Sequence, residues 1–131
     1  MTKYRVTLTE RQLRLVSKCV EDCHRFAAGQ TELWNTTSEF NIKEWSELRD
    51  RLLELQPLVT PELGRCASYG WSGGRCENKH QRKFIAETYP IYREILHFFA
   101  VKEGQDNVYS SETLTCEEGG QLPIIEEVNE E

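Results

Sequence analysis

Long apolar runs are absent from this sequence: no stretch approaches the roughly 18 consecutive apolar residues that a membrane-spanning helix needs. The opening residues, MTKYRVTLTE, are polar and lead directly into a periodic pattern, so we expect no secretory leader. These two absences argue against a secreted protein and against a membrane protein. The 131 residues suit one domain, residues 1–131, whose acidic end, about 129–131, is expected to fray.

Short motifs for enzymatic chemistry are also missing. The glycines form neither a Walker phosphate loop nor the strand-linked GxGxxG of dinucleotide-binding folds. No motif links the three histidines, His24, His80 and His97, to a serine or cysteine nucleophile, and His97 is expected to be a partly buried helix residue. We therefore predict a protein that is not an enzyme and that has no catalytic residue and no cofactor.

A CxxC pair is absent from the sequence, and the cysteines are odd in number. Without a secretory leader, five cysteines argue for reduced thiols in a cytosol. Cys19 and Cys23 fall on the apolar stripe of a predicted helix, so we interpret them as core thiols. Cys66, Cys76 and His80 are zinc-ligand types, but their spacing matches no common zinc finger, and we predict no metal.

Basic residues are outnumbered by acidic ones, 16 to 22, and are unevenly distributed. The formal charge of -6 argues against binding to duplex nucleic acid, which depends on lysine and arginine to neutralise phosphates. From residue 103 onwards there are nine acids and no lysine or arginine, whereas Arg65 to Lys83 contain five basic residues and one acid. This basic segment is a candidate anion site, with a solvated helix start as the alternative.

Three helices are predicted from apolar spacing and capping residues. Thr9 and Gln12 form a capping box that opens the first helix, which runs to Gly29. The second is expected to open at Asn41 and Glu44 and to end at Pro57, with one further turn over residues 60–63. The third is expected to begin at an Asn78 cap and to end at Gly104, with Pro90 inside it as a kink.

Strands are predicted at both ends of the chain. Residues 4–8 alternate in polarity, and short strands are expected over residues 107–109, 113–116 and 123–128. The predicted fold class is α+β, with a small antiparallel sheet from the N-terminal strand and the short C-terminal strands, packed with two to three long helices. Because so small a sheet rarely stands alone, we expect a homo-oligomer, a dimer or higher, in which strands pair between subunits.

The segment from residue 64 to residue 79, GRCASYGWSGGRCENK, has four glycines and no apolar periodicity, so an irregular loop is predicted. It offers groups that a nucleotide needs: guanidinium groups at Arg65, Arg75 and Arg82 for phosphates, and aromatic faces at Tyr69 and Trp71. The loop leads into a helix N-terminus, which favours an anion. The alternative is that the aromatic residues cover the core and the arginines pair with the acidic tail.

Four segments together carry a resemblance to small phage and prophage proteins: YRVTLTERQLRLVSKCVEDCHRFAAGQ, ELGRCASYGWSGG, YPIYREILHFFA and QLPIIEEV. The chain resembles the Thoeris anti-defence family, whose members sequester the cyclic ADP-ribose signals of bacterial immunity. The resemblance implies a non-enzymatic, oligomeric sponge in the cytoplasm of the infected bacterial host, with a cyclic nucleotide as its partner. Some relatives also accept cyclic oligonucleotides at a separate site.

Carried over to this sequence, the resemblance implies ligand contacts from the loop, from the end of the third helix and from the segment after it. These residues are Arg65, Tyr69, Trp71, Arg75, Phe99 and Asn107, with Arg25 as a candidate for a second anion site. The acidic C-terminal part fits this interpretation less well, because carboxylates oppose phosphate binding. Two other functions stay open: an acidic, anti-CRISPR-like protein that inhibits a bacterial defence complex, and an enzyme that cleaves the signal.

Overall fold

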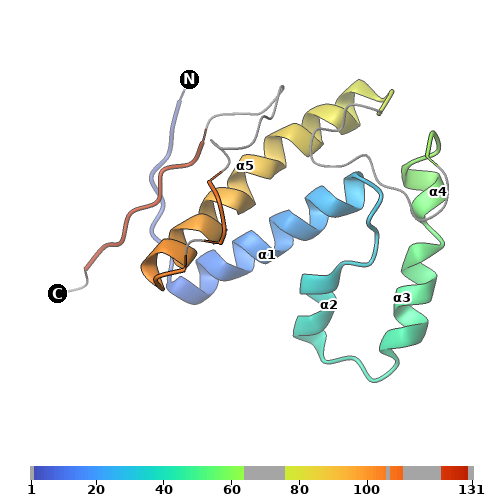
Figure 1. The fold of residues 1–131 in the computed structure, drawn as a ribbon, viewed down its shortest axis with the longest axis horizontal. Helices are drawn as coiled ribbons and strands as arrows, with labels where there is room; N and C mark the ends of the chain where they lie inside the picture. The colour runs from blue at the N-terminus through green and yellow to red at the C-terminus, as the bar shows by residue number, and fades with distance from the viewer. Residues whose placement is uncertain (1, 64–75, 106, 111–121, 130–131) are drawn as a thin grey trace.

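The computed structural model describes residues 2–63, 76–105, 107–110 and 122–129. Two long helices dominate these residues: α1 (Glu10–Ala27) and α5 (Lys79–Lys102) lie side by side and run in opposite directions (Figure 1). The shorter helices α2 (Trp34–Phe40), α3 (Trp45–Leu53) and α4 (Gln56–Val59) follow α1 in the chain. Of these, α2 packs on α1.

Helix α1 begins and ends as the sequence predicts. Thr9 accepts a hydrogen bond on its hydroxyl oxygen from the backbone N–H of Gln12 at 3.1 Å, and Gln12 Oε1 accepts one from the backbone N–H of Thr9 at 2.9 Å. This reciprocal pair satisfies two of the N–H groups that a helix start leaves free. At the other end Gly29 has a φ of 107°, a conformation that glycine adopts at little cost and that turns the chain out of the helix.

Helix α5 also agrees with its predicted caps. Asn78 Oδ1 accepts hydrogen bonds from the backbone N–H groups of His80 and Gln81 at 3.0 and 3.2 Å. Pro90 lies inside the helix, and Gly104, with a φ of 75°, follows its last turn. The 24 residues form one continuous helix about 36 Å long, which places the ends of α5 far apart.

The core lies mainly along the face of α5 that packs on α1. The buried residues of α5 include Ile85, which is fully buried, and Tyr89 and Tyr92, whose rings both contact the imidazole of His24 from α1. A second part of the core joins Ile85 to Ala28, Leu63 and Cys76. The α1–α5 pair therefore supplies most of the apolar burial that stabilises the described fold.

The region between residues 34 and 57 differs from its prediction. No helix is predicted from the sequence for residues 34–38. The structure nevertheless forms α2 there, and this helix ends at Asn41, which has a φ of 51°. The cap predicted at Asn41 and Glu44 does not form, because α3 starts at Trp45 without a side-chain cap. Pro57 lies in the first turn of α4, where its missing N–H costs nothing, and does not end a helix.

The α+β prediction is wrong for the residues that the structure describes, which contain helices and no strand. Residues 2–8 and 122–129 are extended, but their backbone groups form no ladder with another described segment. An alternating pattern predicts an extended chain with one apolar side, and it does not supply the neighbouring strand that a sheet requires. The strand predicted over residues 113–116 lies outside the described residues.

Cys19 and Cys23 are exposed, so their prediction as core thiols is wrong. The buried residues of α1 are Ser17, Asp22 and His24, which lie on other sides of the helix. Asp22 contacts α2 and His24 contacts α5 through polar groups. The apolar stripe of α1 is therefore only partly covered within one chain. Among the described residues, no helix has both the length and the apolar character needed to cross a membrane.

Candidate functional site

The structure places the predicted ligand residues in different regions. Arg65, Tyr69, Trp71 and Arg75 lie outside the described residues. The residues that flank them, Leu63 and Cys76, are packed together in the core with Ile85, near the start of α5. Phe99 and Asn107 lie at or beyond the other end of α5, about 30 Å along the helix from Lys79. The described part of the chain thus separates these two residues from Leu63 and Cys76, which flank residues 64–75.

Phe99 is also unsuited to stacking on a ligand. Its side chain is buried, and the Arg14 guanidinium lies over its ring with 4.0 Å between Cζ and the ring centroid. Arg14 is held there by Glu103, at 2.7 Å. This cation–π contact occupies one ring face and joins the start of α1 to the end of α5. Asn107, in contrast, is exposed.

The start of α5 is cationic. Its first turns contain Lys79, His80, Arg82 and Lys83, with no acid in the first turn. Lys79 and Lys83 are exposed and form no ion pair with any residue that the structure describes. Cations at a helix N-terminus are electrostatically unfavourable, because the helix dipole already makes this end positive. A bound anion would relieve that repulsion.

Polar contacts hold this end of α5 in place. Arg82 Nη1 donates to the carbonyl of Cys76 at 3.2 Å, which fixes the residues that immediately precede the helix. Gln81 Nε2 donates to the carbonyls of Ala27 and Val59 at 2.7 and 2.8 Å. The start of α5 is thereby joined to the ends of α1 and α4. These hydrogen bonds fix the backbone that carries the cationic side chains.

A cleft of about 570 Å³ lies on another part of the molecule, between α1, α2 and the α3–α4 region. Arg25, the predicted second anion site, is part of its lining together with Trp34, which is half exposed. Arg25 Nε donates to Glu21 Oε2 at 2.8 Å and its Nη1 to Gln30 Oε1 at 2.7 Å. The guanidinium is therefore already engaged by acceptors of its own chain.

The charge of this cleft opposes a phosphate. Its lining contains three carboxylates, Glu21, Asp22 and Glu32, and one cation, Arg25. In a concave site the field of the carboxylates is focused, so an anionic ligand would be repelled. The volume suits a small molecule, but the groups suit a neutral or cationic one. Arg25 is therefore not part of the anion site that we propose.

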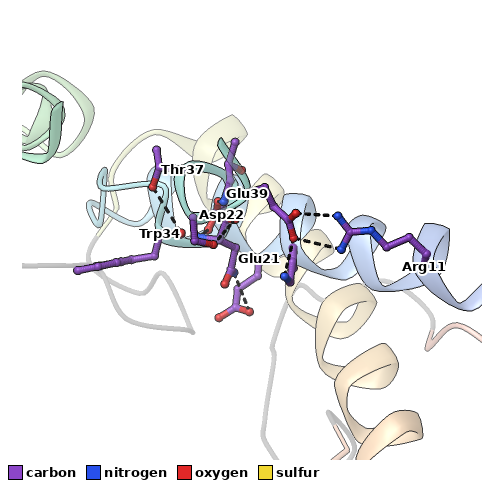
Figure 2. A network of polar contacts seen from close by, with 10 residues as sticks. Arg11, Glu21, Asp22, Trp34, Thr37 and Glu39 are labelled. Atoms are coloured by element: carbon purple, nitrogen blue, oxygen red, sulfur yellow. Dashed lines mark hydrogen bonds and ion pairs between the residues drawn. The ribbon is translucent and has the colours of Figure 1, made fainter. Parts of the chain in front are cut away.

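Buried Asp22 organises one wall of the cleft (Figure 2). Its two carboxylate oxygens accept hydrogen bonds from the backbone N–H groups of Asn35 at 3.2 Å and Thr36 at 2.6 Å. Helix α2 has no cap of its own, since Leu33, at its N-cap position, has a φ of 54° and no capping side chain. Asp22 therefore caps α2 from α1 and also complements its dipole.

Glu39 makes the second connection between α1 and α2 (Figure 2). It accepts hydrogen bonds from both Nη atoms of Arg11, at 3.2 and 2.7 Å, and from Lys18 Nζ at 2.7 Å. The hydrogen bonds from Arg11 and then from Lys18 lower the pKa of the Glu39 carboxyl to about 2. Because these groups are solvent-exposed, we interpret the network as orienting α2 more than as stabilising the fold.

The Asp22→Ala variant is expected to destabilise the protein by roughly 1–2 kcal/mol, because it leaves two N–H groups of α2 without their acceptor. Asp22→Asn, which keeps one carbonyl oxygen, is expected to lose less. Hydrogen–deuterium exchange should show faster exchange in residues 35–40 of the alanine variant and unchanged protection in the middle of α5. Equal exchange in α2 of the wild type and the alanine variant would contradict the capping role.

His24 has no access to a substrate. Its side chain is 3% exposed, and Nδ1 lies 2.9 Å from the carbonyl oxygen of Ile85 and 3.0 Å from Thr88 Oγ1. Burial lowers the pKa of His24 to about 4, an effect that the hydrogen bond to Ile85 only partly offsets. The neutral imidazole therefore donates from Nδ1 to Ile85 and fixes α1 against α5.

His97, in α5, also makes a contact that serves the fold. His97 is partly buried, as expected from the sequence, and its Nδ1 lies 2.7 Å from the carbonyl oxygen of Val108. This contact holds the segment after α5 against the helix. In the described part of the chain, no group of three or more histidine, cysteine or acidic residues is arranged to hold a metal ion. Cys76, one of the zinc-ligand types in the sequence, is buried in the core.

Comparison of the chain with protein-family models, with curated proteins and with solved structures gives no match.

Proposed function

We propose that this protein binds and sequesters a cyclic nucleotide signal in the cytoplasm of an infected bacterial host, without cleaving it. The proposal takes the ligand class from the resemblance to the Thoeris anti-defence family: a cyclic ADP-ribose isomer, with cyclic oligonucleotides as further candidates. It rests structurally on one observation, the cationic start of α5. There Lys79 and Lys83 lack ionic partners among the described residues and add to the positive end of a long helix.

The position of this end of α5 supports the proposal. Residues 64–75, which include Arg65, Tyr69, Trp71 and Arg75, are flanked by Leu63 and Cys76, and both flanks pack beside Ile85 in the second turn of α5. A phosphate at the start of the helix would lie near Leu63 and Cys76, the two described residues that flank this segment in the chain. Arginine pairing with phosphate and stacking of a base on an aromatic ring are both strong contacts.

Sequestration needs tight binding and slow release, and it needs no catalytic group. A protein acting in this way must be present at a concentration comparable with that of the signal, since each site removes one molecule. Neither buried His24 nor His97, which is bound to Val108, is placed to act as a general base on such a ligand. We propose this site for binding; His80, exposed in the first turn of α5, is the histidine that a cleavage reaction there would have to use.

The Lys79→Ala/Lys83→Ala variant is expected to bind a cyclic nucleotide at least about tenfold more weakly than wild type, because charge-assisted contacts to phosphate are lost. Binding would be measured by isothermal titration calorimetry with cyclic ADP-ribose isomers and with cyclic di- and trinucleotides. Lys43→Ala is the matched control, since Lys43 is also an exposed lysine and lies on the connection between α2 and α3. Alanine at positions 79 and 83 preserves helix propensity.

The outcome separates the proposal from its main alternative, an acidic inhibitor that binds a protein of a bacterial defence complex. If the wild type and the Lys79→Ala/Lys83→Ala variant bind the nucleotide with equal affinity, the ligand does not bind at the start of α5. If no nucleotide in the panel binds at all, while replacement of Glu112, Glu117 and Glu118 by lysine abolishes anti-defence activity in cells, the acidic inhibitor becomes the better account.

A further inference from the structure

The cleft between α1, α2 and the α3–α4 region has an aromatic side chain on its wall. Trp34, the first residue of α2, lines the cleft and is 50% exposed (Figure 2). Its ring centroid lies 4.9 Å from that of Trp45, the first residue of α3, so packing against a second tryptophan positions the indole. A large ring left half exposed beside a cleft offers a surface that a ligand gains by covering.

The charges of the cleft do not cancel within the described chain. Arg25 Nε lies 2.8 Å from Glu21 Oε2, so these two side chains neutralise each other. Both carboxylate oxygens of Asp22 are occupied by backbone N–H groups of α2. Glu32 is different, because no lysine, arginine or histidine that the structure describes forms an ion pair with it. One partly buried carboxylate on the wall of the cleft therefore keeps its full negative charge.

Glu32 and Trp34 are joined to each other, since Trp34 Nε1 donates a hydrogen bond to Glu32 Oε2 at 3.2 Å. The two side chains attract the same kind of ligand. The carboxylate attracts a cation and accepts hydrogen bonds from its N–H groups, and an indole face attracts a cation through its quadrupole. The concave surface focuses the field of Glu32. The pair therefore forms a recognition element for an organic cation.

The size and the donors of the cleft distinguish an organic cation from a metal ion. The volume of about 570 Å³ lies within the range of small-molecule sites and is far larger than a bare ion needs. An indole ring supplies no metal ligand, and the described histidine, cysteine and acidic side chains include no group of three or more that is placed to hold a metal. Leu53, also in the lining, adds apolar surface that suits a carbon chain.

We propose that this cleft binds a small organic cation, a primary amine or a guanidinium on a short apolar stem. The charged head pairs with Glu32 and lies against the ring of Trp34, and the stem covers Leu53. Gln56, which is buried in the lining, donates to the carbonyl of Gly29 at 2.8 Å and holds the start of α4 against the end of α1. No residue of α5 lines the cleft, so this inference does not depend on the proposed function.

Four probes with the same four-carbon chain test the charge selectivity: agmatine, putrescine, 1,4-butanediol and succinate. They would be titrated into ¹⁵N-labelled protein at about 0.15 M salt, which screens general attraction to an acidic chain. We expect agmatine and putrescine to shift the indole N–H signal of Trp34 in a saturable way, and butanediol and succinate to leave it unchanged. The signal is assigned by its absence from the Trp34→Leu variant.

Two substitutions are expected to change the affinity for agmatine in opposite directions. Glu32→Gln keeps an acceptor for Trp34 Nε1 and removes only the charge, and it is expected to weaken binding at least about fivefold. Arg25→Gln leaves Glu21 without its cation, and it is expected to tighten binding about threefold or more. Glu87→Gln is the matched control, because Glu87 is an exposed glutamate on α5 outside the lining, and it is expected to bind as the wild type does.

Each part of the inference has a result that overturns it. Equal shifts with putrescine and butanediol would show that the cleft does not select charge. Equal weakening in Glu32→Gln and Glu87→Gln would show a general attraction of cations to an acidic protein. Saturable binding of succinate that is lost in Arg25→Gln would identify an anion site in the cleft instead. Circular dichroism of the glutamine variants checks that the helices are retained, and neither variant alters Trp34.

Discussion

Lowering the pH from 7 to 5 is expected to reduce the free energy of unfolding by about 2 kcal/mol through His24 alone. The pKa of His24 is about 4 in the folded protein against an ordinary value of 6.5, chiefly because the imidazole is buried. Above pH 6.5 the side chain is neutral in both states and the stability is fully present. Below pH 6.5 the unfolded chain binds a proton that the folded chain excludes, so stability falls until the pH reaches about 4.

Urea unfolding at pH 7, 6 and 5 measures this effect. In His24→Gln the unfolding free energy is expected to be lower at pH 7, because the packing against Tyr89 and Tyr92 is lost, and to depend much less on pH. His80→Gln is the control, since His80 is an exposed residue at the start of α5, and it is expected to keep the wild-type dependence. A wild-type stability that does not change between pH 7 and 5 would contradict the buried, neutral state of His24.

Truncation of Ile85 is expected to have the largest effect of any single substitution, with Ile85→Ala destabilising the protein by about 2–5 kcal/mol. Ile85 has no exposed surface and joins the α1–α5 contact to the core that contains Leu63 and Cys76. Removal of its side chain leaves a cavity that rigid helix backbones on both sides cannot close. The same cavity would loosen Leu63 and Cys76, the two described residues that flank residues 64–75.

Ile91→Ala provides a matched comparison, because it makes the same chemical change about one and two-thirds turns further along α5, at an exposed position. It is expected to change the unfolding free energy by less than about 1 kcal/mol. Chemical denaturation of the two variants in parallel gives the difference directly. Similar losses in both would show that residue 85 is not at the centre of the core.

The helices that the sequence predicts well are those whose signals are local. Thr9 with Gln12, and Asn78 with the turn that follows it, satisfy N–H groups only two or three residues away, so their role can be inferred from spacing. The start of α2 cannot be inferred in this way. Its cap, Asp22, lies 13 residues earlier on another helix, and the chain enters through a left-handed Leu33 that no propensity favours.

The predictions that failed treated an apolar pattern as proof of burial. Val6 and Ile124 alternate as strand residues do, and Cys19 and Cys23 lie on an apolar stripe, but all four are exposed in the single chain. A pattern shows which side of an element is apolar and cannot show whether the covering partner belongs to the same chain.

The candidate site could be predicted only in part from the sequence. The surplus of cations around residues 79–83 was visible as a local charge asymmetry, and the structure anchors that end of α5 through Gln81 and Arg82. The burial of Phe99 beneath Arg14 and the engagement of Arg25 by Glu21 could not be predicted, because both depend on how helix faces are oriented. The cleft beside α2, with its acidic lining, was likewise not expected.

Recovery of the bound molecule tests sequestration most directly. The protein would be incubated with a cyclic ADP-ribose isomer, separated from free ligand and heat-denatured, and the released compound would be identified by mass spectrometry. We expect release of the unchanged nucleotide in one-to-one ratio with binding sites, and a loss of retention in Trp71→Ala and Arg75→Ala variants that keep the helical circular dichroism of the wild type. Release of a linearised or hydrolysed product would instead identify an enzyme, and failure to retain any cyclic nucleotide would contradict the proposed function.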